Sequence, residues 1–302
     1  MTTTLEELLE KTSRTFALSI PVLPEPTRRQ VMLAYLLFRI ADTFEDASHW
    51  PAPLRIDALN EFRDLLHDYS PEKAARLSSK WTAAGVSPHA GYRQLISETP
   101  FVLDAFFQLD PEAVASVRDH VSRSAEGMAK FVARTDGGVL ILNDMIDLRA
   151  YCYSVAGIVG EMLSELFLLK RPALLAIAPY LRERASTFGE ALQLVNILKD
   201  AADDETEGRS FLPKRVPRSE VFGLAREDLA IAAEYTVALQ DAGAPRGLVE
   251  FCALPVELAW ATLRKVEERG PGSKVSHLEL FAIRKRLERA LDRNEPAVVI
   301  RR

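Results

Sequence analysis

The sequence has few cysteines, no long apolar run and no surplus of basic residues, and each shortage excludes a class of protein. Its two cysteines, Cys152 and Cys252, lie far apart without CxxC or Cys/His zinc spacing. We expect both to be buried as small apolar side chains in a cytoplasmic protein. The net charge of −5, with acids and bases interspersed, argues against a nucleic acid partner.

Membrane-spanning and exported proteins are disfavoured in the same way. The most apolar stretches, such as VMLAYLLF and PALLAIAPYL, are well short of the ~20 apolar residues that span a bilayer. The first residues, MTTTLEELLEKTSRTF, lack the basic-then-apolar order of a secretory signal, so we expect no export. Peripheral contact with a membrane through an amphipathic face stays open.

Strand-like alternation is scarce, whereas apolar residues recur at helical spacing along most of the chain. Examples are LEELLEKTSRTFALSI, LRIDALNEFRDLLHDY and AVASVRDHVSRSAEGMAKFVA. The short apolar runs GGVLIL and AVVI are too isolated to build a sheet. With no low-complexity linker, fixed repeat or shift in composition, the sequence predicts one all-α domain over residues 1–302.

The segment YLLFRIADTFEDASHW, residues 35–50, carries three acids after an apolar run. On a helix Asp42, Glu45 and Asp46 share one face, with Arg39 one turn earlier. Like charges one turn apart destabilise a helix by a few tenths of a kcal/mol, so solvent, a basic group or a metal ion should compensate them.

A second polar stripe lies in GEALQLVNILKDAADDETEGRSFLP, residues 189–213. On a helix Gln193, Asn196, Asp200 and Asp204 form a continuous stripe through otherwise apolar positions. One such stripe would be read as an ordinary solvated helix face. Two stripes, each inside an apolar run, favour a functional role over two ordinary solvated helix faces.

Two facing carboxylate pairs suit the binding of a diphosphate through Mg²⁺. Magnesium prefers oxygen ligands and is usually held by one or two carboxylates together with phosphate oxygens of the substrate. The metal would also make diphosphate a better leaving group. Acid/base hydrolysis by paired carboxylates, as in glycosidases, needs one pair rather than two sets.

At these motifs the chain resembles the squalene/phytoene synthase family of head-to-head prenyl synthases. KTSRTFALSI resembles the family's entry motif and ADTFED its first aspartate-rich motif. EGMAKF and YCYSVAGIVG resemble its central helices, and LQLVNILKDAADDETEGRSFLP its second aspartate-rich motif. The resemblance implies an all-α isoprenoid synthase bundle with a central cavity.

The resemblance also assigns residues to roles. It implies Mg²⁺ ligands at Asp42, Glu45, Asp46, Asp200 and Asp204. It implies catalytic parts for Tyr151, Arg39 and Phe16. It implies substrate binding by Ser13, Arg14, Arg39, Gln193, Asn196, Lys199, Ala156 and Gly157. Tyr151 and Phe16 could instead be core aromatics. Ala156, Gly157 and Gly160 could serve close helix packing rather than room for a prenyl chain.

The activity implied is Mg²⁺-dependent joining of two farnesyl diphosphates to presqualene diphosphate and squalene, with NADPH required for squalene. The absence of GxGxxG is uninformative, because the family binds NADPH without that motif. Lys199 stands where members of that family commonly have an arginine, and Ser154 stands where squalene synthases usually have a second aromatic residue. Phytoene or dehydrosqualene synthesis, a terpene cyclase acting on one prenyl diphosphate, and a non-catalytic helical subunit remain alternatives.

Overall fold

Helix α3 (Thr27–Glu45) forms where the sequence places apolar residues at helical spacing. Leu33, Leu37 and Phe44 lie on its inner face and are inaccessible to solvent. The helix ends at Asp46, whose backbone N–H donates to the carbonyl oxygen of Asp42 at 2.8 Å. The first acidic stripe therefore occupies the last turn of a helix that is anchored in the core.

The computed structural model describes residues 3–13, 16–135, 140–206 and 210–301, without the side chains of residues 203–206. The chain divides into two compact units. Unit 1 comprises Met1–Pro21 and Glu25–Gly138, and unit 2 comprises Val22–Pro24 and Val139–Arg302. The single domain over residues 1–302 stays a prediction.

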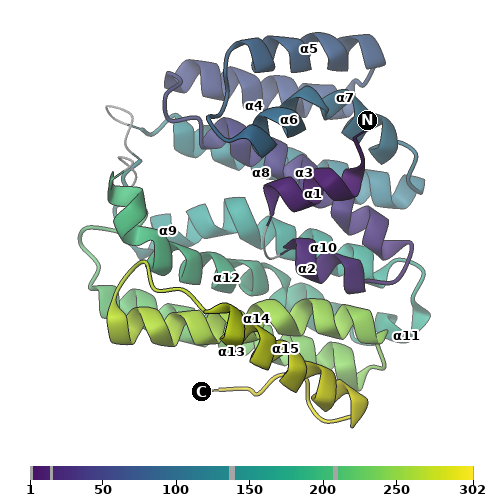
Figure 1. Ribbon diagram of the computed structural model, residues 1–302, viewed down its shortest axis with the longest axis vertical. Helices are drawn as coiled ribbons and strands as arrows, with labels where there is room; N and C mark the ends of the chain where they lie inside the picture. Colours follow the sequence, from purple (N-terminus) through teal and green to yellow (C-terminus); the bar gives the residue numbers. More distant parts are fainter. Residues whose placement is uncertain (1–2, 14–15, 136–139, 207–209, 302) are drawn as a thin grey trace. The chain divides into compact units, whose positions relative to one another are not determined.

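Unit 1 is built from eight helices within its described residues, and a 3-10 turn η1 (Ile20–Val22) follows the second of them. The helices are α1 (Leu5–Thr12), α2 (Phe16–Ser19), α3, α4 (Ala52–His67), α5 (Pro71–Ala83), α6 (Ala90–Ser97), α7 (Thr99–Phe106) and α8 (Pro111–Val132). Helix α3 packs against α4, α7 and α8 (Figure 1). Phe44 of α3 meets Trp81 edge-on, with ring centroids 4.8 Å apart.

Unit 2 contains the second acidic stripe on a helix of 29 residues, α12 (Ala178–Thr206). Helices α10, α13 and α14 pack around α12 (Figure 1). A π-helical turn, η2, joins α9 to α10. The elements are α9 (Met145–Cys152), η2 (Tyr153–Gly157), α10 (Ile158–Leu168), α11 (Pro172–Leu175), α12, α13 (Arg218–Asp241), α14 (Arg246–Arg269) and α15 (His277–Asp292).

The predicted all-α class is confirmed. In the part of the chain that the structure describes, extended pairing is confined to one isolated bridge between Ile141 and Ser210. Cys152 and Cys252 are buried, as predicted. None of the described helices is both long and apolar enough to cross a membrane. The central cavity stays a prediction.

Candidate active site

The last turns of α3 bring Arg39, Asp42 and Asp46 to one face of the helix. Arg39 Nη1 lies 3.2 Å from Asp42 Oδ2, and both side chains are about three-quarters buried. Asp46, one turn further along, is exposed. The first acidic stripe thus starts with an ion pair that is about three-quarters buried and continues to an exposed aspartate.

Two tyrosines that sequence reasoning missed hold Arg39 in place. Its guanidinium carbon lies 5.6 Å from the ring centroids of Tyr35 and Tyr92. Arg39 Nε also donates to the Tyr35 hydroxyl at 3.4 Å, and that hydroxyl donates to the carbonyl oxygen of Thr12 at 2.8 Å. This network fixes the direction in which the guanidinium points.

The carboxyl of Asp42 is poised to accept a cation. Burial raises its pKa to about 6, Arg39 opposes that rise, and the nearby Asp46 carboxylate adds to it. A divalent ion would offset both the burial and the repulsion between the two carboxylates. Asp42 and Asp46 therefore fit the carboxylate pair that typically holds Mg²⁺ together with substrate phosphate oxygens.

Glu45 lies in a different environment from the two aspartates. Its residue is only 9% exposed, and its backbone carbonyl accepts a hydrogen bond from Arg55 Nη2. Among the described residues, no three or more His, Cys, Asp or Glu side chains are grouped so that they could hold a metal ion. Metal binding by Glu45 stays a prediction.

Phe16 and Ser13 lie near the same network in unit 1. The backbone N–H of Phe16 donates to Ser13 Oγ at 2.9 Å. The Phe16 ring packs on Tyr35, with centroids 5.4 Å apart. Phe16 is thereby linked through Tyr35 to Arg39, and its catalytic role stays a prediction. Arg14 lies outside the described residues.

In the second stripe, on α12, a lysine side chain pairs with the first aspartate, as Arg39 pairs with Asp42 in the first stripe. Lys199 Nζ lies 3.1 Å from Asp200 Oδ2 and donates to Asn196 Oδ1 at 3.1 Å. Gln193 and Asp200 are half-buried, whereas Asn196 is exposed. The structure thus joins Asn196, Lys199 and Asp200 in one polar chain. The side chain of Asp204 lies outside what the structure describes.

Tyr151 lies in the last turn of α9 and is 4% exposed. Its ring stacks on Phe211 with a centroid distance of 4.8 Å and an interplanar angle of 24°. Arg149, two residues earlier, donates to Asp228 of α13 at 3.0 Å. Sequence reasoning identified Tyr151 but neither its stacking partner Phe211 nor Asp228, the partner of Arg149.

A family model described as squalene/phytoene synthase matches residues 9–242, more than half of the chain. The chain belongs to the squalene/phytoene synthase family. The predicted resemblance is therefore confirmed. All of the predicted site residues, from Ser13 to Asp204, lie inside the matched range.

Several squalene synthases are similar to this family member over most of its length. That of Saccharomyces cerevisiae is 29% identical over 283 residues, covering 86% of this chain and 60% of the yeast protein. That of Eremothecium gossypii is 30% identical over 281 residues, covering 86% and 61%. The chain thus spans about 60% of the length of these relatives.

Solved structures of squalene/phytoene synthase family proteins share the fold. TcSQS in complex with the ligand E5700 aligns with a TM-score of 0.77 at 24% identity, covering 93% of this chain and 84% of that one. A dehydrosqualene synthase in complex with a ligand aligns with a TM-score of 0.56 at 24% identity, covering 96% and 95%. At these identities the likeness shows the fold alone.

The small residues around η2 allow close helix packing in this squalene/phytoene synthase family member. A Cβ atom on Gly160 would lie 1.9 Å from the carbonyl oxygen of Ala185 on α12. One on Gly189 would lie 2.0 Å from the carbonyl oxygen of Ala156. One on Gly157 would meet the Tyr153 ring at 2.8 Å and Glu190 Oε1 at 3.2 Å. Close packing therefore explains Gly160, whereas substrate contact by Ala156 and Gly157 stays a prediction.

Proposed function

We propose that the chain catalyses the Mg²⁺-dependent, head-to-head condensation of two farnesyl diphosphates to presqualene diphosphate and then squalene. The observation that carries the proposal is the Arg39–Asp42 ion pair beside Asp46, within a family of squalene and phytoene synthases. A guanidinium can bind diphosphate oxygens in a bidentate way, and the carboxylates can bind the metal that accompanies diphosphate.

Asp42 and Asp46 would hold Mg²⁺ in unit 1, with Glu45 as a further candidate, and Asp200 and Asp204 would hold it in unit 2. When bound, the metal would neutralise charge on the departing diphosphate. Tyr35 and Tyr92 keep the guanidinium of Arg39 oriented before substrate arrives, which lowers the cost of binding. Ser13, Arg14 and Lys199 would supply further donors to the diphosphate.

Tyr151 would act where the carbon–oxygen bond to diphosphate breaks. Its ring is held by Phe211 and its residue is almost fully buried, so the hydroxyl has a defined position. A hydrogen bond from this hydroxyl to the departing oxygen would strengthen as negative charge develops there. Phe16, packed on Tyr35, would border the carbocation with its ring face.

Squalene is the product that we favour, because the similar proteins from S. cerevisiae and E. gossypii are squalene synthases. Its formation from presqualene diphosphate needs a hydride, for which NADPH is the proposed donor. Dehydrosqualene is the second candidate, because the matched family includes phytoene synthases as well as squalene synthases. It forms by loss of a proton and needs no reductant.

The test incubates the purified chain with farnesyl diphosphate, in Mg²⁺ or EDTA and with or without NADPH, and identifies lipids by mass spectrometry. We expect a product from two prenyl chains that requires Mg²⁺ and becomes squalene when NADPH is present. Asp42→Asn and Asp200→Asn should each lower turnover by about 10²-fold or more. Asp57→Asn, an exposed position on α4, is the matched control. Full turnover in EDTA would refute the proposal.

A further inference from the structure

Helix α15 presents large apolar side chains to solvent. Leu278 is 82% exposed and Phe281 is 61% exposed. Lys285 and Arg289, both exposed, follow at helical spacing on the same face. Lys285 Nζ lies 5.8 Å from the centroid of the Phe281 ring, so the apolar and basic parts of this face adjoin. We call Leu278, Phe281, Lys285 and Arg289 the docking face.

The segment that contains α15, residues 274–293, has a net charge opposite in sign to that of the chain as a whole. Residues 274–293 contain six basic and three acidic residues, a formal net charge of +3, whereas the whole chain carries −5. The rest of the chain is therefore more acidic than its total suggests. Helix α15 itself has four basic and three acidic residues, so most of the surplus comes from Lys274 and Arg293 just outside its two ends. An anionic surface would attract residues 274–293 and repel the remainder, which would orient the molecule with α15 toward that surface.

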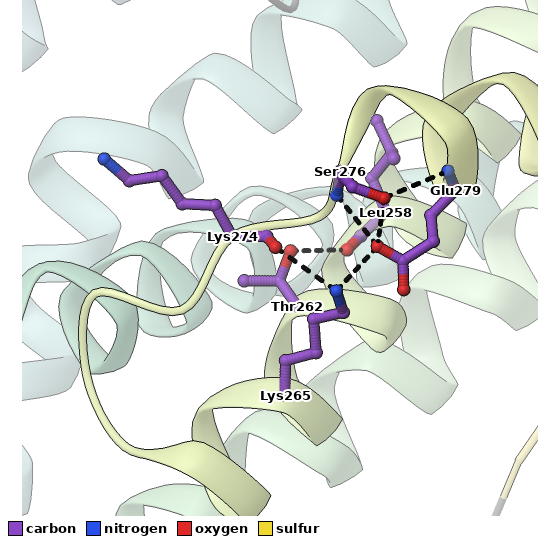
Figure 2. A network of polar contacts seen from close by, with 6 residues as sticks. All are labelled: Leu258, Thr262, Lys265, Lys274, Ser276 and Glu279. Carbon is purple, nitrogen blue, oxygen red and sulfur yellow. Dashed lines mark hydrogen bonds and ion pairs between the residues drawn. The ribbon is translucent and has the colours of Figure 1, made fainter.

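The docking face is held in position before any partner arrives. Ser276 caps α15 by accepting from the backbone N–H of Glu279, and the Glu279 carboxylate accepts from Ser276 in return. Lys265 of α14 donates to the same carboxylate at 2.6 Å and to the carbonyl oxygen of Lys274 at 3.3 Å (Figure 2). These bonds tie the first two turns of α15, which carry Leu278 and Phe281, to α14.

A second tether fixes the far half of α15. Glu257 of α14 is 3% exposed and accepts hydrogen bonds from Arg286 of α15 and from Arg301, the latter at 3.0 Å. Leu287 is buried on the inner side of the same helix. With its inner side fastened in this way, α15 keeps the docking face directed outward.

We propose that α15 docks on the surface of an anionic lipid bilayer. Leu278 and Phe281 would enter the boundary between headgroups and acyl chains. Lys285, which forms an exposed ion pair with Glu288 at 2.8 Å, would exchange that partner for a lipid phosphate, and Arg289 would pair with another. This combination of apolar anchors and basic residues on one helix face is typical of helices that lie in a membrane interface. The inference rests on α15 alone and holds whatever reaction the chain catalyses.

The experiment measures sedimentation of the whole chain with vesicles. One set contains phosphatidylcholine only, and the other contains phosphatidylcholine with phosphatidylserine. We expect binding to the anionic vesicles that weakens as salt is raised. Leu278→Ser combined with Phe281→Ser should lower the apparent affinity by about tenfold or more. Lys285→Gln combined with Arg289→Gln should lower it by about tenfold on the anionic vesicles.

Ile146→Ser is the matched control for the apolar variant. Ile146 is 79% exposed and lies on α9 between Asp144 and Asp147, and its basic neighbour at helical spacing, Arg149, is bound to Asp228. It should leave vesicle binding unchanged, and the melting temperature of each variant checks its fold. Equal binding by wild type and the Leu278/Phe281 variant would overturn the proposal, as would the absence of binding to anionic vesicles.

A second copy of the chain is the rival occupant of the docking face. Sedimentation velocity without lipid distinguishes the two. If wild type is a dimer and the Leu278/Phe281 variant a monomer, the face is a protein interface and the lipid proposal is wrong. An unchanged sedimentation coefficient together with lost vesicle binding supports the lipid proposal.

Discussion

Replacing Gly160 with alanine should strongly destabilise unit 2, because α10 and α12 approach each other too closely at this residue for any side chain. The added Cβ atom would lie 1.9 Å from the carbonyl oxygen of Ala185 and 2.9 Å from its carbonyl carbon. Both are backbone atoms in the interior of α12, so a helix would have to shift. Overpacking of this kind costs about 3 kcal/mol, the upper part of the usual range.

Gly223 provides the matched control. It lies within α13 of the same unit, and a Cβ atom there would meet nothing within 4 Å. Gly223→Ala should stabilise the protein by about 0.5–1 kcal/mol, because alanine is the better helix former. The two substitutions are chemically identical, so their opposite effects isolate the close approach of the two helices.

Thermal unfolding followed by circular dichroism measures the difference. Gly160→Ala should lower the melting temperature by roughly 6 °C or more, whereas Gly223→Ala should raise it by about 2 °C. Gly189→Ala, whose Cβ atom would lie 2.0 Å from the carbonyl oxygen of Ala156, should behave like Gly160→Ala. If Gly160→Ala melts within about 1 °C of wild type, the close packing of α10 on α12 is wrong.

Three further predictions concern single side chains. Tyr151→Phe keeps the stack on Phe211 and loses only the hydroxyl, so kcat should fall while KM changes little. Single-turnover kinetics test this, and weakened binding with unchanged kcat would contradict a transition-state role. Lys199→Arg should keep activity within about tenfold, whereas Lys199→Ala should raise KM, and an unchanged KM in the alanine variant would place Lys199 outside the site. Burial raises the pKa of Glu190 above its ordinary value of 4.5, so the folded state binds the proton more tightly than the unfolded state does. The free energy of unfolding that Glu190 contributes is therefore lost as pH rises from the unfolded-state pKa through the folded-state pKa. Glu190→Gln should therefore gain stability over wild type as pH is raised from about 4.5 to 8 in urea unfolding, and a difference that does not vary with pH would refute this.

The sequence predicted those parts of the site that lie within one helix. Helical spacing placed Asp42 one turn and Asp46 two turns beyond Arg39, and Asp200 one turn beyond Asn196. Tyr35, one turn before Arg39, could have been found by the same rule. Such spacing relates residues on one helix only, so it identifies neighbours up to a few turns away.

Contacts between helices were beyond that rule. Tyr92 reaches Arg39 from α6, Phe211 reaches Tyr151 from the segment after α12, and Asp228 reaches Arg149 from α13. These pairs are set by how whole helices pack, and no local pattern encodes them. The role of Gly160 was likewise undecided from sequence, because only the distance between α10 and α12 distinguishes close packing from room for a substrate.

The proposed reaction joins two prenyl chains in one product molecule and depends on Mg²⁺. An equal mixture of unlabelled and deuterium-labelled farnesyl diphosphate, supplied with Mg²⁺ and NADPH, tests it by mass spectrometry of the lipid extract. We expect three mass classes of product, carrying none, one and two labelled halves, and we expect all three to be lost in EDTA. A product in only two classes, fully labelled and unlabelled, would show that each molecule derives from a single prenyl diphosphate and would refute the head-to-head reaction.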